Sequence, residues 1–123
     1  VDADEGPNGL QNFPLIVNVR RGDSGYRVYG QIDAPTHVNI QLDVYASVIP
    51  DLSMHGEGAE RIGTAQIRTR PISPTSFVVW VHGERDLSGL FLTMTASRIT
   101  ATDGGAVMLS TSEFSPVVQV DED

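Results

Sequence analysis

The amino-terminal residues of this chain carry side chains that could bind a metal ion. Asp2, Asp4 and Asn8 place oxygen ligands at short spacing, and Gly6 allows the chain to turn back so that its backbone carbonyl joins them. Ligands of this kind suit calcium, although the EF-hand loop pattern and its terminal bidentate glutamate are missing. The spacing predicts a calcium site, and an acidic linker is the alternative interpretation.

A second group of polar residues lies in segment 50–60, which contains two glycines and shows no regular spacing of hydrophobic residues. Within it, His55 and Glu57 could bind a metal ion or another ligand, or form an acid–base pair with Asp51 or Glu60. Zinc sites usually need about three or four nitrogen or sulfur donors, and the histidines of this chain are far apart in sequence. A solvated loop histidine is the simpler interpretation.

The aromatic residues raise the question of a sugar-binding surface. Trp80 lies in the run "SFVVWVH" at 76–82, which is apolar on both faces of a strand. A strand of that kind is usually central in its sheet, so a core position is favoured for Trp80. If the indole instead points outward beside Tyr26 or Tyr29, these rings would form a flat platform for stacking on sugars.

Two short motifs overlap at residues 21–25. "GDSG" matches the nucleophile segment of trypsin-like proteases, and "RGD" is the integrin-binding tripeptide. A catalytic triad also needs a base held by its own scaffold, and proteases of that class are far longer than this chain. Gly, Asp and Ser are the residues that tight turns require, so a hairpin turn explains both matches. The sequence therefore predicts no enzyme.

The elements that would position these residues are β-strands. Apolar and polar residues alternate from 38 to 47, which is the pattern of a strand with one buried face. Similar runs are expected at 14–20, 26–32, 62–69, 76–82, 91–99, 107–110 and 116–120. Turn residues separate them, and no window shows a capped helical period. We predict an all-β fold, an antiparallel two-sheet β-sandwich of the immunoglobulin-like kind, with seven to eight strands. Its interior is expected to hold Val38, Ile40, Leu42, Val44, Leu92, Met94, Ala96 and Phe114.

Composition limits the partners. The 8 basic residues, all of them arginine, face 16 acidic ones, and the formal charge of −8 repels phosphate backbones. Nucleic acid is therefore not an expected partner. No apolar run approaches the roughly 20 residues of a membrane span, so no membrane insertion is expected. Cysteine is absent, which leaves no disulfide or thiolate ligand.

Five segments resemble one known module in the same order. They read "DADEGPNGLQNFPLI" at 2–16, "GQIDAPTHVNIQLDVYAS" at 30–47, "GEGAERIGTAQIRT" at 56–69, "LFLTMTAS" at 90–97 and "STSEFSPVVQV" at 110–120. Together they resemble the β-sandwich repeats of large bacterial secreted and surface proteins, often found beside parallel β-helices and CSLREA-motif segments. The resemblance implies an extracellular, immunoglobulin-like module without enzyme activity in a longer, adhesin-like chain. The stretch "RITATDGGAVMLS" at 98–110 is longer than in those modules, and the cysteines that some of them carry are missing.

We expect one module over residues 1–123, in which 1–13 form a linker and plug. Leu10 and Phe13 are expected to close one end of the sandwich, with Asn12 bonding backbone groups. Glu113 is placed to tie this plug to the last strand.

The acidic ends predict a joint between modules. Residues 121–123 would begin the next linker, so that Asp2 and Asp4 of one module meet the end of another around an inter-module calcium ion. The favoured function is a non-catalytic structural or adhesive module of a secreted or cell-surface protein, with neighbouring modules of the same chain as partners. A carbohydrate-binding module attached to a polysaccharide-degrading enzyme is the alternative, with a polysaccharide or cell-surface ligand.

Overall fold

Alternating apolar and polar residues form eight β-strands in the described part of the chain. The computed structural model describes residues 12–35, 37–49, 60–71, 74–102 and 104–121. The strands are β1 Leu15–Gly22, β2 Gly25–Ile32, β3 Asn39–Ser47, β4 Glu60–Arg68, β5 Thr75–His82, β6 Phe91–Thr102, β7 Gly105–Thr111 and β8 Val118–Gln119. Within those ranges no helix is long and apolar enough to span a membrane.

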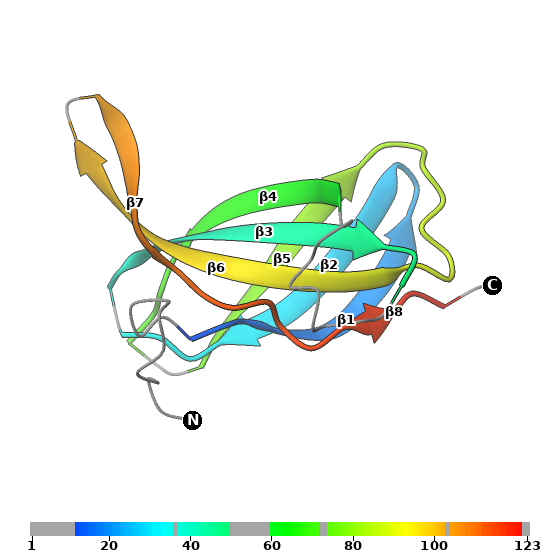
Figure 1. Ribbon diagram of the computed structural model, residues 1–123, viewed down its shortest axis with the longest axis horizontal. Coiled ribbons are helices and arrows are strands. Elements are labelled where there is room, and N and C mark those ends of the chain that lie inside the picture. Colours follow the sequence, from blue (N-terminus) through cyan, green and yellow to red (C-terminus); the bar gives the residue numbers. More distant parts are fainter. Residues whose placement is uncertain (1–11, 36, 50–59, 72–73, 103, 122–123) are drawn as a thin grey trace.

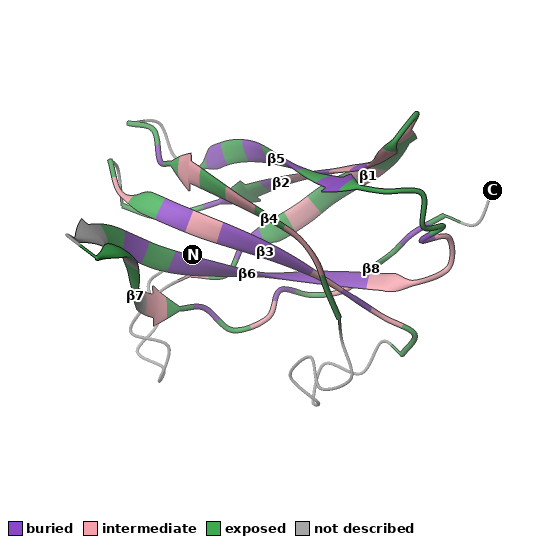
Figure 2. Ribbon diagram, turned by 90° about the horizontal axis from the view of Figure 1, so that it is seen from above, coloured by how far each residue is buried: buried purple, intermediate pink, exposed green. Residues whose placement is uncertain are grey.

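The strands form two antiparallel sheets that pack face to face (Figures 1 and 2). One sheet has three strands in the order β1-β2-β5. The other has five, in the order β4-β3-β6-β7, with β8 also paired to β6. The predicted all-β sandwich of seven to eight strands is therefore confirmed, and its immunoglobulin-like assignment remains a prediction. The hairpin of β6 and β7 is longer than predicted, because it continues past Ile99, the last β6 residue that pairs with β3, to Thr102 and Gly105.

The core lies between the sheets and is built mainly from one face of each of the strands β1 to β6 (Figure 2). In β5, for example, Phe77, Val79 and Val81 are buried while the residues between them are exposed. Six of the eight predicted interior residues are fully enclosed or nearly so: Ile40, Leu42, Val44, Leu92, Met94 and Ala96. Val38 is half-buried and packs against the edge of this core.

The prediction for Phe114 is wrong. Its ring meets the ring of Tyr45 edge-on, with centroids 5.3 Å apart and an interplanar angle of 76°. Tyr45 lies between the core residues Val44 and Ala46 in β3, so its side chain leaves the opposite face of the sheet. Phe114 therefore packs on the outside of the five-stranded sheet, not between the two sheets.

Two serines connect the irregular segment 112–117 to β6. Ser112 donates its backbone N–H to the carbonyl of Ala96 at 2.8 Å, and its hydroxyl accepts the Ala96 N–H at 2.9 Å. Ser115 does the same with Met94, at 2.9 Å and 3.0 Å. In a regular ladder the second bond would go to a backbone carbonyl. The serine hydroxyls replace that acceptor, so the "TSEFS" segment continues the sheet between β7 and β8.

The two ends of the described chain lie at opposite ends of the sandwich (Figure 1). At one end, Asn12 donates from Nδ2 to the carbonyl of Asp33, at 2.7 Å, as predicted. Phe13 is 37% exposed and the adjacent Pro14 is buried. Leu10 lies outside the described residues, so the plug remains a prediction. At the other end, Val120 is buried and exchanges backbone hydrogen bonds with the turn before β6.

Candidate functional site

The outer face of the three-stranded sheet carries the exposed tryptophan. Trp80 is 47% exposed, because Phe77, Val79 and Val81 occupy the inner face of β5 and alternation turns the indole outward. The core interpretation of Trp80 is therefore wrong. β5 is apolar on both faces although it is an edge strand, since its outer face holds the indole and Val78.

Two neighbours hold the indole in place. The guanidinium carbon of Arg27, the residue opposite Trp80 in β2, lies over its ring, 5.0 Å from the centroid. His82 follows two residues later on the same face, and its ring is stacked with the indole at 6.0 Å and 13°. Trp80 is thus a supported aromatic surface rather than a loose side chain.

The two tyrosines of β2 separate onto opposite faces. Tyr29 lies on the outer face, beside an open depression of about 360 Å³ whose lining also includes Val17, Gln31, Ser76 and Val78. Tyr26 is only 3% exposed and belongs to the core. The predicted platform therefore keeps Tyr29 and Trp80 and loses Tyr26, because residues three apart on a strand face opposite ways.

The hydroxyl of Tyr26 forms hydrogen bonds with the connection between β5 and β6. It accepts the backbone N–H of Leu87 at 3.1 Å and donates to Asp86 at 3.2 Å. The pKa of Asp86 lies below its ordinary value, chiefly because the Ser88 hydroxyl and backbone N–H donate to this carboxylate, with smaller effects of Tyr26 and the Arg21 guanidinium. These bonds hold the β5–β6 connection against the end of the core.

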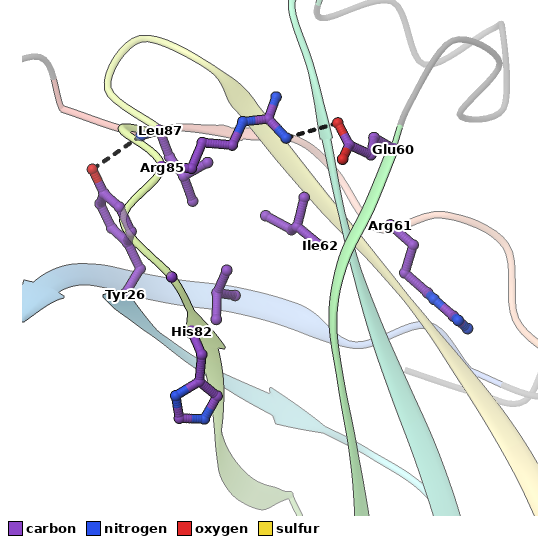
Figure 3. A pocket seen from close by; sticks show the side chains of 9 residues that line it. Tyr26, Glu60, Arg61, Ile62, His82, Arg85 and Leu87 are labelled. Atoms are coloured by element: carbon purple, nitrogen blue, oxygen red, sulfur yellow. Dashed lines mark hydrogen bonds and ion pairs between the residues drawn. The ribbon is translucent and has the colours of Figure 1, made fainter. Parts of the chain in front are cut away.

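A second hollow lies between the ends of β4 and β5 and has a volume of about 260 Å³ (Figure 3). Two of its polar side chains are paired with each other, since Arg85 Nη1 lies 2.7 Å from Glu60 Oε1. Arg61 and His82 belong to its lining, but their side chains point away from it (Figure 3). Arg61 reaches the buried carboxylate of Asp43, at 3.6 Å. Because its charged side chains form ion pairs within the protein, we interpret this hollow as part of the structure rather than as a binding site.

The remaining predicted positions divide into two groups. Residues 23 and 24 form the turn between β1 and β2, so the predicted hairpin turn is confirmed. The other positions lie outside the described residues: the calcium ligands Asp2, Asp4, Gly6 and Asn8, and the loop residues His55 and Glu57. Within the described ranges no three His, Asp or Glu side chains lie close enough together to share a metal ion. The calcium site remains a prediction.

One feature of the outer face was missed from the sequence. Arg20 in β1 lies directly opposite Arg27 in β2, so a row of Arg20, Arg27 and Trp80 crosses the three strands. The register of the pairing, which alternation alone does not give, is needed to see it. The absence of acidic residues from these strands was the available signal.

No protein-family model matches the chain, and no curated protein matches it either.

Proposed function

We propose that this domain is a non-catalytic structural and adhesive module of a secreted or cell-surface protein, connected in series with other modules. The observation that carries the proposal is the placement of the two ends of the described chain at opposite ends of the sandwich (Figure 1). Modules with such ends join end to end without folding back on one another.

The terminal strands support this function mechanically. β1 begins where the chain enters and is paired with β2 along its length, from Leu15 to Gly22. β8 and the two serines connect the exit to β6. Antiparallel hydrogen bonds run perpendicular to the strands, so a pull along the array loads many of them in shear at once. Calcium at Asp2, Asp4, Gly6 and Asn8 belongs to the same proposal, as the ion that stiffens each joint.

Small-angle scattering of a protein with two copies in tandem tests the proposal. We expect an extended pair whose maximum dimension approaches that of two sandwiches end to end, and calcium should straighten it further. A matched pair joined by an inserted Gly/Ser linker should show a broad distribution of distances. A native pair that scatters like the flexible control, with or without calcium, would contradict the proposal.

A second candidate function is carbohydrate binding, and a specific observation favours it. Trp80 is exposed, held by Arg27 and His82, and shares its face with Tyr29. An aromatic ring presented on a rigid sheet suits the apolar face of a sugar ring. This role is compatible with the first, because the outer sheet face stays free when modules join through their ends.

A further inference from the structure

The three-stranded sheet differs in charge from the rest of the molecule. The chain has 16 acidic residues and a formal charge of −8, yet none of those acids falls in β1, β2 or β5. The same strands carry Arg20, Arg21 and Arg27. Arg21 turns to the rim, where it lies 3.6 Å from Asp86. Arg20 and Arg27 remain on the outer face and make it locally basic.

These two arginines form an unfavourable pair. Arg20 and Arg27 are directly opposite each other in the β1–β2 ladder, and like charges in that position destabilise a sheet. Neither forms an ion pair with a carboxylate in the described part of the chain, where the paired arginines are Arg21, Arg61 and Arg85. A bound anionic group between the two guanidinium groups would relieve the repulsion.

Arg27 is positioned for such a group. Its guanidinium lies over the Trp80 ring, and stacking of this kind leaves in-plane N–H donors available to a carboxylate or sulfate. Its Nε is enclosed and has no hydrogen-bond partner among the described residues. A buried donor without a hydrogen-bond partner lowers the stability of the fold, so the position of the Arg27 side chain is not explained by stability alone.

The apolar part of the face indicates which kind of molecule would present the anionic group. Beside the arginine pair lie the Trp80 indole, Tyr29 and Val78, next to the open depression of about 360 Å³. An extended peptide gains its main-chain hydrogen bonds at a strand edge, whereas the face of a paired sheet offers only side chains. A chain of sugar rings uses aromatic side chains directly, through its apolar ring faces.

We propose that the outer face of the three-stranded sheet binds an anionic polysaccharide, with Trp80 under a sugar ring and the guanidinium groups of Arg20 and Arg27 on its carboxylate or sulfate. The proposal rests on the second candidate function, carbohydrate binding, and specifies the ligand class as acidic. The ligand needs no metal ion at this face, because the arginines supply the positive charge.

Binding can be measured with two matched pairs of ligands. Polygalacturonate is compared with its methyl ester, and dextran sulfate with dextran, so that each pair differs only in charge. The single tryptophan of the chain makes intrinsic fluorescence a direct reporter of this face, and calorimetry gives the affinity. We expect at least one acidic polymer to bind clearly more tightly than its neutral partner, and added salt to weaken that binding.

Three variants and a control test the assigned residues. Arg27→Gln and Arg20→Gln should each weaken binding about 10- to 100-fold, the range expected for a lost charge-assisted hydrogen bond. Trp80→Ala should weaken it about tenfold, followed by calorimetry because the fluorophore is gone. Arg98→Gln removes the same charge from an exposed position of the other sheet and should leave the affinity within about twofold. Unchanged melting temperatures of these surface variants would exclude unfolding as the cause.

The outcomes separate the two proposals. If acidic and neutral partners bind equally and Trp80→Ala abolishes both, carbohydrate binding holds and the anionic specificity is overturned. If no polymer binds, or if the face variants bind like the wild type, both are overturned and the end-to-end module remains. Poly-glutamate serves as a further probe. If it binds as tightly as the acidic glycans and ignores Trp80→Ala, simple charge attraction replaces the proposed site.

Discussion

Replacing Ser115 with alanine tests whether serine hydroxyls continue the β6 ladder. The Ser115 side chain is fully buried, and its Oγ lies 3.0 Å from the N–H of Met94, 3.2 Å from the Thr93 hydroxyl and 3.1 Å from the carbonyl of Pro116. Ser115→Ala removes the acceptor and leaves a buried N–H in β6 without a partner. Such a loss costs about 1–3 kcal/mol.

The assay is equilibrium unfolding in urea followed by circular dichroism. For a domain of this length the loss corresponds to a melting temperature about 3–15 °C lower, with an unchanged m-value. Ser112→Ala should behave alike, since it removes the acceptor of the Ala96 N–H. Ser76→Ala, at an exposed strand position, is the matched control and should stay within about 0.5 kcal/mol. If Ser115→Ala is as stable as this control, the hydroxyl does not act as a ladder acceptor and the reasoning fails.

Three further predictions concern the core, the indole and the Asp86 cluster. Leu42→Ala should lower the free energy of unfolding by about 2–5 kcal/mol, because the side chain is fully enclosed. The exposed Val48→Ala should stay within about 0.5 kcal/mol in the same urea titration, and equal losses would place Leu42 outside the core. Acrylamide should quench Trp80 strongly in the folded protein, whereas weak quenching would mean that the indole is inside. Because the pKa of Asp86 is lowered in the folded state, its contribution to stability is present above the ordinary aspartate pKa and is lost as pH falls through the lowered value. The stability difference between wild type and Asp86→Asn should therefore shrink in acid, and a difference independent of pH would refute this assignment.

Much of the fold could be predicted from alternation alone. A period of two identifies which residues share a face, and turn residues mark where strands end, so the positions of β2, β3 and β5 differ by only a residue or two from those expected. Alternation does not say which face turns inward when both are apolar. In β5 the side chains of Phe77, Val79 and Val81 fill the core, and Val78 and the larger, partly polar indole of Trp80 lie outside.

The candidate site was less predictable because it depends on pairing between strands. Alternation alone places Tyr26 and Tyr29 on opposite faces of their strand, but the register with β5 is needed to see that Tyr29 is the one that shares a face with Trp80. The row of Arg20, Arg27 and Trp80 comes from three separate strands and has no local signature. Phe114 was misplaced because the serine bonds direct its segment along the edge of β6 rather than into the sandwich.

Single-molecule pulling through the two ends of the chain tests the proposed role in series most directly. Handles at the ends load β1 and β8 in shear, whereas a handle at Gln31→Cys, which lies opposite Leu15 at the open end of the β1–β2 hairpin, combined with the amino-terminal one peels β1 from β2 one hydrogen bond at a time. The absence of native cysteine makes this attachment specific. We predict a clearly higher unfolding force for the end-to-end geometry. An end-to-end force equal to or below the peeling force would contradict a module built to transmit tension.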